Sequence, residues 1–413
     1  MILHAVLKQR IVEGRLSVVF SDGQVRNYGD GSGPPVAVRL TRAGERRLMR
    51  NAALGLGEAF MEQDLILERG DVWEMLNLIG RNFRHERRPR YGLGWRLKAE
   101  VDRRLHQVND RLVARRNVAH HYDLSFDLYR RFLDGDLQYS CAYFARPDMS
   151  LDEAQAAKKA HIAAKLNLTE PGLSVLDIGC GWGGMALTLA GDYGARVTGV
   201  TLSKEQLAVA ERRAGERGLE GRVRFALSDY RDVPGPFDRI VSVGMFEHVG
   251  EPNYRTYFRR IADLLRDDGV ALVHSIGRKS PPSPTDPFVA KYIFPGGYIP
   301  ALSEVMTAVE ESGLWVTDVE ILRLHYADTL RAWRERFLAQ RNAVALMYDE
   351  RFCRMWEYYL ALSELSFRHG DHMVVQLQLA KRVDSLPMTR DYMAEGERQG
   401  ALKAWRSGRQ RQK

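Results

Sequence analysis

The stretch that most constrains the fold is Leu173–Leu189, which reads Leu-Ser-Val-Leu-Asp-Ile-Gly-Cys-Gly-Trp-Gly-Gly-Met-Ala-Leu-Thr-Leu. Its apolar, β-branched start predicts a buried parallel strand, and the glycines and the residues after them predict a turn and then a helix. Glycines at 179, 181 and 184 allow close approach of backbone to ligand, and a helix N-terminus offers unpaired N–H groups. The segment therefore predicts a nucleotide-binding crevice, although a glycine turn without a ligand stays open.

The pattern from this stretch onward alternates between apolar runs and amphipathic stretches. Strands are predicted at 173–178, 196–200, 223–227, 237–243, 269–275, 314–322 and 373–382, and helices near 183–191, 203–217, 254–266, 327–340 and 345–368. Alternation at this spacing predicts an α/β fold in which helices cover both faces of a parallel sheet.

The length of 413 residues exceeds one average domain, so we expect two or three domains. The predicted organisation is an N-terminal α+β domain over 1–80, a basic linker or helix over 81–116, a catalytic domain over 117–390 and a basic C-terminal tail over 391–413. In the N-terminal domain, short alternating runs near 15–20 and 36–40 predict strands.

The net charge of +8 is concentrated in one segment. Residues 81–116 hold twelve Lys and Arg against four Asp and Glu, and twelve minus four equals the charge of the whole chain. Such a segment suits a polyanion, either nucleic acid or an anionic membrane surface. A solvated helix face is the plainer explanation of a charge run alone, although Phe83, Tyr91 and Trp95 favour an interface.

The sequence shows no signal for export or for a membrane span. No apolar run approaches the roughly 20 residues that cross a bilayer, and the N-terminus lacks a signal-peptide core. A cytoplasmic location is therefore expected. Cys141, Cys180 and Cys353 are isolated, which argues against a disulfide framework and against a metal cluster.

Polar residues follow each predicted strand of the central sheet. They are Asp177 after the first strand, Thr201, Ser203 and Gln206 after the second, Asp229 and Tyr230 after the third, Glu247 and His248 after the fourth, and His274 and Ser275 at the end of the fifth. Ligands of open α/β sheets bind at this edge, so these side chains are candidates for one site. A chance distribution also stays open, because strand ends are commonly polar.

Two of these residues are hard to explain by chance. Glu247 has apolar neighbours in Val243-Gly-Met-Phe-Glu-His-Val, so its carboxylate will be desolvated and needs a partner. Capping or pairing with an arginine is the alternative. His274 ends an apolar strand, where a lone histidine is more often structural, and Cys141 taken alone is a simple buried thiol.

The glycine spacing also satisfies the fingerprint of hydride-transfer enzymes. Those enzymes use an acidic residue after the second strand to hydrogen-bond the ribose of the cofactor. This chain has Thr201-Leu-Ser at that position. The run Asp177-Ile-Gly-Cys-Gly-Trp-Gly183 instead resembles the S-adenosylmethionine motif, in which an acidic residue precedes three alternating glycines.

Five motifs in order resemble the cyclopropane-fatty-acyl-phospholipid synthase (mycolic acid cyclopropane synthase-like) family. They are Asn117-Val-Ala-His-His-Tyr-Asp-Leu-Ser, Tyr139-Ser-Cys-Ala-Tyr-Phe, Val175-Leu-Asp-Ile-Gly-Cys-Gly-Trp-Gly-Gly, Asp238-Arg-Ile-Val-Ser-Val-Gly-Met-Phe-Glu-His-Val-Gly and Lys291-Tyr-Ile-Phe-Pro-Gly-Gly. The resemblance is dense from about 115 to 385 and covers the N-terminal domain more weakly.

The resemblance implies a class I methyltransferase with a Rossmann-like seven-stranded sheet and a smaller N-terminal α+β domain. Such an enzyme moves the methyl group of S-adenosylmethionine to the cis double bond of a phospholipid acyl chain and closes a cyclopropane ring, with bound bicarbonate as the base. The implied bicarbonate ligands are Cys141 and Ile276 through their backbone, Glu247, His274 and Tyr326.

The implied cofactor residues follow the same motifs. They are Tyr139 and Ser140 over the cofactor, Gly179 and Gly181 beside its methionine moiety, Thr201, Ser203 and Gln206 near the ribose, and Asp229 and Tyr230 near the adenine, with Asp177 as the acidic residue of the cofactor motif. The resemblance also favours docking of 81–116 on the inner face of an anionic membrane over nucleic acid, and it allows a homodimer.

One departure from the family concerns a late helix. Some members carry a cysteine there, whereas this chain has Ser363, and Cys353 lies ten residues earlier. A cysteine nucleophile is therefore poorly supported. Related enzymes of this fold give methyl- or methylene-branched products or act on other unsaturated lipids, and a methyltransferase of small soluble molecules and a silent lipid-binding protein remain rival classes.

Overall fold

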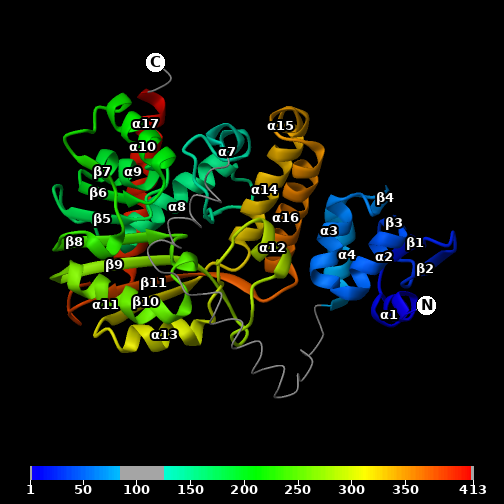
Figure 1. Ribbon diagram of the computed structural model, residues 1–413. Coiled ribbons are helices and arrows are strands. Elements are labelled where there is room, and N and C mark those ends of the chain that lie inside the picture. Colours follow the sequence, from blue (N-terminus) through cyan, green and yellow to red (C-terminus); the bar gives the residue numbers. More distant parts are fainter. Residues whose placement is uncertain (1, 84–124, 411–413) are drawn as a thin grey trace. The chain divides into compact units, whose positions relative to one another are not determined.

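The computed structural model describes residues 2–83 and 125–410, with side chains as far as residue 400 (Figure 1). The chain divides into two compact units. The first holds 1–101, 284–295 and 330–372, and the second holds 102–283, 296–329 and 373–413. The boundaries predicted at 80, 116 and 390 stay predictions, and the basic segment 81–116 lies almost wholly outside the described residues.

The first unit contains a small sheet with the strand order β2-β1-β3-β4. Its strands are β1 (Arg15–Val19), β2 (Val25–Tyr28), β3 (Pro35–Leu40) and β4 (Leu65–Arg69). β1 and β3 run parallel, and the other two pairs are antiparallel. Leu16 and Val18 alternate with more exposed residues along β1, which is the pattern of a sheet buried on one face.

Helices of two distant chain segments complete the first unit. They are α1 (Ile2–Arg10), α2 (Arg42–Arg50), α3 (Ala52–Met61) and α4 (Val72–Phe83), then α12 (Pro287–Tyr292), α15 (Arg341–Met347) and α16 (Glu350–Arg368); α14 (His325–Ala339) enters the unit at Leu330. The helix predicted over 345–368 is therefore two helices. The backbone of Asp349 is extended, so the helix is interrupted at this residue. The Asp349 side chain then caps α16 by accepting a hydrogen bond from the Phe352 N–H.

The second unit is built on a seven-stranded sheet with the order β10-β11-β9-β8-β5-β6-β7 (Figure 1). The strands are β5 (Ser174–Ile178), β6 (Arg196–Thr201), β7 (Val223–Leu227), β8 (Phe237–Val243), β9 (Leu265–Arg278), β10 (Trp315–Ile321) and β11 (His372–Ala380). β5 to β9 pair in parallel, and β10 and β11 pair antiparallel. The predicted α/β class is confirmed, and the antiparallel strands β10 and β11 extend the parallel part of the sheet.

Helices cover both faces of this sheet. α8 (Leu151–Lys165), α9 (Gly184–Tyr193) and α10 (Lys204–Glu216) share one apolar core with strand residues such as Val175 and Val241. α11 (Tyr254–Leu264) and α13 (Leu302–Glu310) share the other core, with Leu176 and Ile240. Successive residues of β5 and of β8 thus face opposite cores, as the period of a strand requires.

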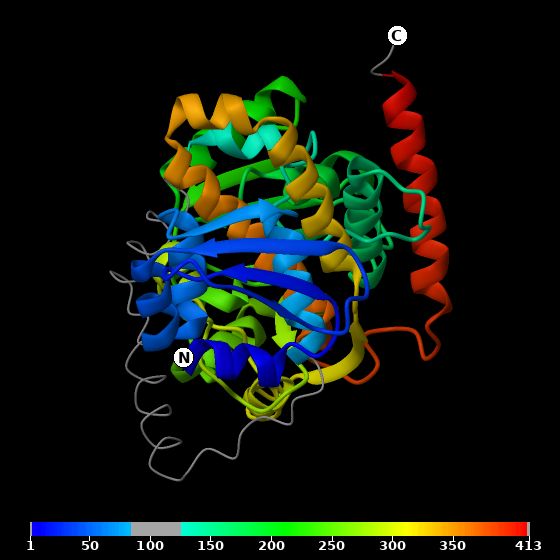
Figure 2. The same cartoon turned by 90° about the vertical axis from the view of Figure 1, so that its right-hand side faces the viewer.

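The segment predicted as a basic tail is a helix. α17 (Asp391–Gln410) packs beside α8, as the red helix in Figure 2 shows. The small residues Gly396 and Gly400 permit the approach, since a Cβ at either position would lie 3.0 Å from an alanine side chain of α8. Among the described residues, no helix is long and apolar enough to cross a membrane.

Candidate active site

The glycine turn lies between β5 and α9. Gly179 and Gly181 have φ angles of 78° and 53°, in the left-handed region that favours glycine. A Cβ at Gly179 would lie 2.9 Å from the Met245 side chain, whereas a Cβ at Gly181 would meet nothing within 4 Å. The turn is therefore closely packed on one side and open at Gly181, where a ligand can approach the backbone.

Asp177, the acidic residue before this turn, is buried at the end of β5. Its Oδ2 atom has no hydrogen-bond partner among the described residues. Burial raises the pKa of its carboxyl group to about 7, against the opposing effects of Lys158 and the Ala186 N–H. A buried carboxyl group with a spare oxygen fits the ammonium group of S-adenosylmethionine.

Three predicted cofactor residues form one hydrogen-bonded group after β6. The Thr201 hydroxyl donates to Gln206 Oε1 at 2.8 Å and accepts from the Ser203 N–H at 3.2 Å. Ser203 caps α10, because its Oγ accepts from the Gln206 N–H at 3.2 Å. The group is buried at the carboxyl edge of the sheet, beside the glycine turn.

Asp229 and Tyr230 follow β7, as predicted. The Asp229 carboxylate accepts from Arg231 Nε and Nη2 at 2.8 and 2.6 Å, a pairing that the sequence analysis missed. Tyr230 packs edge-on against Tyr257 with ring centroids 5.4 Å apart, and burial raises the pKa of Tyr230 to about 12. The Tyr230 ring is therefore neutral and offers an aromatic surface to a ligand at this end of the sheet.

Glu247 lies in a short 3₁₀ turn (Phe246–His248) directly after β8. Its Oε1 accepts the Ile276 N–H at 2.6 Å, and its Oε2 is buried without a hydrogen-bond partner among the described residues. Burial raises the pKa of the carboxyl group to about 7. Within residues 125–410 no arginine pairs with it, so the alternative of an arginine partner does not hold there.

His274 points from the interior of β9 and is 2% exposed. Its Nδ1 lies 3.1 Å from Gln376 Nε2 on β11, and its Nε2 has no hydrogen-bond partner among the described residues. Burial holds the pKa of His274 well below its ordinary value, so the ring is neutral. With the Gln376 amide donating to Nδ1, the proton of the ring is carried by Nε2.

The loop that carries Cys141 is joined to the start of α14. The Ala142 N–H donates to Thr329 Oγ1 at 3.0 Å, and Tyr326 lies three residues before Thr329, on the same side of the helix. Burial raises the pKa of the Cys141 thiol far above its ordinary value, so this sulfur stays protonated. Cys141 can therefore contribute a backbone group or a neutral thiol, and no thiolate.

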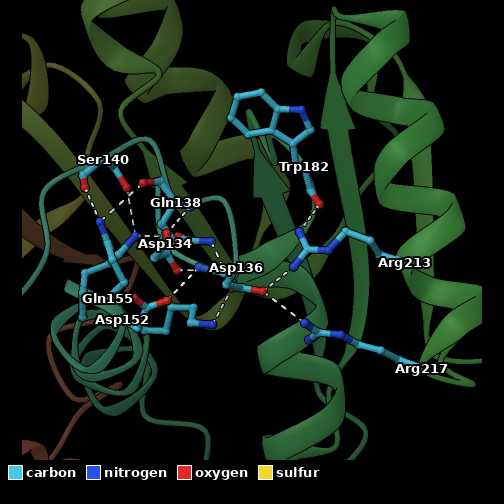
Figure 3. Close-up of polar contacts among 12 residues, drawn as sticks. Asp134, Asp136, Gln138, Ser140, Asp152, Gln155, Trp182, Arg213 and Arg217 are labelled. Carbon is cyan, nitrogen blue, oxygen red and sulfur yellow. Dashed lines mark hydrogen bonds and ion pairs between the residues drawn. The ribbon is translucent and has the colours of Figure 1, made fainter. Parts of the chain in front are cut away.

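Charged side chains fix the same loop from the other side (Figure 3). Asp136 accepts from Lys159 and Arg213 and from Arg217 at 3.1 Å, and Arg213 also donates to the Trp182 carbonyl at 2.6 Å. The loop and the glycine turn are thus held by one guanidinium group. Sequence reasoning missed this connection, because it joins residues far apart in the chain.

The residues that sequence reasoning missed share one signal. Thr329 and Gln376 are fully buried polar side chains, and so are Gln155 and Lys158 on α8. Each interrupts an otherwise apolar or small-residue pattern, as Gln376 does within Val-Val-Gln-Leu on β11. A buried polar group requires a hydrogen-bond partner, so such interruptions mark residues that hydrogen-bond and position other parts of the site.

The sheet order, the glycine turn after β5 and the acidic residue before that turn define a class I S-adenosylmethionine-dependent methyltransferase. The crevice fits the cofactor, since Gly181 is open and Asp177 keeps a spare buried oxygen. Similarity to known proteins identifies the family within this class.

The family described as mycolic acid cyclopropane synthetase matches residues 109–377, and a domain of unknown function matches residues 2–85. The cyclopropane-fatty-acyl-phospholipid synthase of Escherichia coli is 39% identical over 347 residues, which cover 82% of this chain and 86% of that protein. The tuberculostearic acid methyltransferase of Mycobacterium tuberculosis is 36% identical over 393 residues, or 92% and 91% of the two chains.

A solved structure agrees with these matches. The mycolic acid cyclopropane synthase CmaA1, complexed with SAH and CTAB, superposes with a TM-score of 0.61 at 36% identity and covers 64% of this chain and 97% of that one. This chain belongs to the mycolic acid cyclopropane synthetase family, as its motifs predicted.

Proposed function

We propose that this protein transfers the methyl group of S-adenosylmethionine to the cis double bond of an unsaturated phospholipid acyl chain and closes a cyclopropane ring, with bicarbonate as the base. One observation carries the proposal. Glu247 Oε2 and His274 Nε2 are buried polar atoms that have no hydrogen-bond partner among the described residues. Glu247 lies in the turn after β8, and His274 lies on the neighbouring strand β9, opposite the last residue of β8. Family membership and the names of the relatives support methyl transfer to a lipid double bond.

The two unsatisfied atoms suit an anion. The protonated form of Glu247 can donate from Oε2, because its Oε1 already accepts the Ile276 N–H. His274 donates from Nε2. Two buried donors without acceptors favour a small anion over water or a cation. Bicarbonate bound there supplies the base for the proton lost from the transferred methyl group.

The remaining proposed ligands are Cys141 and Ile276, through their backbone, and Tyr326. Their roles rest on the family resemblance, and the Ile276 N–H already serves Glu247, so its contribution would come through the carbonyl oxygen. The proposed cofactor residues are Tyr139, Ser140, Asp177, Gly179, Gly181, Thr201, Ser203, Gln206, Asp229 and Tyr230.

The protein aligns the methyl donor with the double bond and excludes water from the reaction. An alkene is a weak nucleophile with no proton to remove first, so the methyl donor and the double bond must be held in line with water excluded. Next to Glu247, Phe246 stacks on Tyr254 with ring centroids 4.3 Å apart, and both rings are buried. This aromatic wall keeps the Glu247 carboxyl group desolvated.

The proposed lipid partner requires contact with a membrane. We assign this role to the basic segment 81–116, which would dock on an anionic surface as part of a peripheral protein. Salt-sensitive sedimentation with anionic vesicles tests this part of the proposal, and equal sedimentation at low and high salt would contradict it. We also propose a homodimer, which the family resemblance allows.

A methyl-branched product is the second candidate. It is favoured by the tuberculostearic acid methyltransferase, whose match covers 92% of this chain. Both candidates use the same cofactor crevice, and they differ in what happens after methyl transfer.

Lipid analysis of cells that express the chain tests the proposal. The wild type is expected to add one CH₂ to unsaturated acyl chains, with ring protons visible by NMR. Glu247→Ala is expected to lower turnover by about 100-fold or more, as loss of one preorganised polar group commonly does, while cofactor affinity stays unchanged. Glu211→Ala, an exposed carboxylate on α10, is the matched control with full activity. Unaltered lipids with the wild type, or full activity in Glu247→Ala, would contradict the proposal.

A further inference from the structure

The loop that holds Ser140 rests on two buried side chains of α8 (Figure 3). Gln155 Nε2 donates to the Ser140 carbonyl oxygen at 2.9 Å. Lys158 Nζ donates to Ser140 Oγ at 2.8 Å and to Gln138 Oε1 at 2.5 Å. The ammonium group therefore contacts two neutral oxygens of the loop.

Lys158 is an unusual lysine. It is 0% exposed, and no carboxylate lies within ion-pair distance of it among the described residues. The next residue, Lys159, pairs with Asp136 in the ordinary way. Burial of an ammonium group without an ion-pair partner in contact is costly, and it lowers the pKa of Lys158 to about 8 against the opposing effect of Asp134. A buried lysine of this kind indicates a functional role for its charge.

The ammonium group of Lys158 determines whether the Ser140 hydroxyl donates or accepts a hydrogen bond. A protonated lysine can only donate, so Ser140 Oγ must accept from it, and the hydroxyl proton is left for another acceptor. No described residue accepts that proton. Ser140 therefore presents a donor, backed by a positive charge, to whatever lies on its open side.

The Ser140 loop lies beside the turns that follow β5 and β8. Gln138 Nε2 lies 2.1 Å from the position of a Cβ at Gly184, so the loop rests on the start of α9. The Ser140 Cβ lies 3.9 Å from the corresponding position at Gly244, directly after β8. The loop thus lies near the carboxyl ends of β5 and β8. The strands that follow β5 and β8 lie on opposite sides of this pair, and such a point of an open α/β sheet is where ligands bind.

We propose that Lys158 is a positioning residue that directs the Ser140 hydroxyl toward the carboxylate of S-adenosylmethionine. The inference rests on the proposed function, because it requires this cofactor in the crevice. Lys158 and Asp177 are close enough for the lysine to lower the carboxyl pKa of Asp177. Together they provide opposite charges for the carboxylate and the ammonium group at the amino-acid end of the cofactor.

Decarboxylated S-adenosylmethionine separates this role from a merely structural one, since it keeps every group except the carboxylate. Affinities of the full chain for both compounds are measured by calorimetry. The wild type is expected to prefer S-adenosylmethionine, and Lys158→Met is expected to lose about 10-fold or more affinity for it, in line with a charge-assisted hydrogen bond, while its affinity for the decarboxylated compound is nearly unchanged. Lys8→Met, an exposed lysine on α1, is the charge-matched control.

Ser140→Ala supplies an independent test if Lys158→Met folds poorly. It should show the same selective loss, and the double variant should lose no more than the larger single loss, because the two residues act in series. Equal losses for both compounds in either variant, or no preference in the wild type, would overturn the inference alone. Failure of both compounds to bind the wild type would contradict the proposed function and the inference with it.

Discussion

At the scale of single residues, Glu247 owes its chemistry to the apolar residues around it. Phe246 and Val249 are buried in the same core, and the carboxyl group between them keeps one oxygen without a partner among the described residues. Burial raises its pKa to about 7, so both protonation states are populated near neutral pH. The protonated state can donate to an anion, and the ionised state repels one.

A pH dependence follows from this pKa. As pH rises through about 7, Glu247 loses its proton, so the affinity for bicarbonate is expected to fall. The measurement is the concentration needed for half-maximal activity in bicarbonate titrations between pH 6 and pH 8.5, expressed as bicarbonate and not as total carbonate. Glu247→Gln keeps a neutral donor and an acceptor at every pH, so its bicarbonate requirement should not vary with pH. The same slope in Glu247→Gln as in the wild type would refute the role of this carboxyl group.

Sequence reasoning reached Glu247 because its local neighbours are informative, whereas the role of His274 came from the resemblance to a family. An acidic residue among Val, Met and Phe is expected to be buried, whereas a lone histidine in an apolar strand is more often structural. Thr329 and Gln376 were beyond its reach. Their partners Ala142 and His274 lie 187 and 102 residues away, and only the folded chain brings them together.

At the scale of elements, α17 is joined to α8 by a buried histidine. His161 bridges Glu397 on α17, at 2.7 Å from Nδ1, and Glu320 on β10, at 2.8 Å from Nε2. Burial opposes a charged ring, but these two carboxylates outweigh it and raise the pKa of His161. Both ring nitrogens must carry protons to serve two carboxylates, so the charged form fastens the helix.

The stability that this bridge provides should depend on pH. The pKa of His161 is higher in the folded chain than its ordinary value of 6.5, so the contribution is fully present below that value and is lost as pH rises through the folded pKa. Glu397→Ala is expected to cost on the order of 1 kcal/mol of unfolding free energy at pH 6 and less at pH 9. Hydrogen exchange of residues 391–400 reports the loss. Glu395→Ala, an exposed neighbour, is the control, and equal effects of Glu397→Ala at both pH values would count against the bridge.

The elements of the second unit were largely predictable. The strands β5 to β8 begin and end within a residue of their predicted bounds, because each apolar run is closed by glycine or polar residues. The first unit was harder. β2 and β4 carry few buried residues and α3 follows α2 after a single residue, so no periodic signal separates them.

At the scale of the whole molecule, the first unit joins three separate stretches of the chain. Glu58 on α3 accepts from Lys291 Nζ at 2.6 Å and from the Tyr292 hydroxyl at 2.9 Å, both on α12. Gly57 lies against the rings of Phe288 and Tyr358. Segments of the predicted catalytic domain are thus part of the core of the first unit. No change in composition along the sequence indicates this.

Gly57 provides a direct test of that packing. A Cβ there would lie 2.4 Å from the Phe288 ring and 2.8 Å from the Tyr358 ring, so Gly57→Ala should lower the free energy of unfolding by about 1–3 kcal/mol, as overpacking does. Gly191→Ala is the matched helical control. Its nearest neighbour lies 3.6 Å away, and alanine there should stabilise the chain by about 0.5–1 kcal/mol. A stabilised Gly57→Ala in thermal unfolding would show that the stretches are not packed in this way.

The central claim is methyl transfer to a lipid double bond followed by ring closure. The most direct measurement incubates the purified chain with S-adenosylmethionine that carries a trideuteriomethyl group, with vesicles of a monounsaturated phospholipid and with bicarbonate. The acyl product is expected to retain two of the three deuterium atoms, because ring closure removes one deuteron from the new methyl group. Its NMR spectrum should show the two methine protons of a cyclopropane ring. A product that retains all three deuterium atoms, or vesicles without deuterium, would contradict the claim.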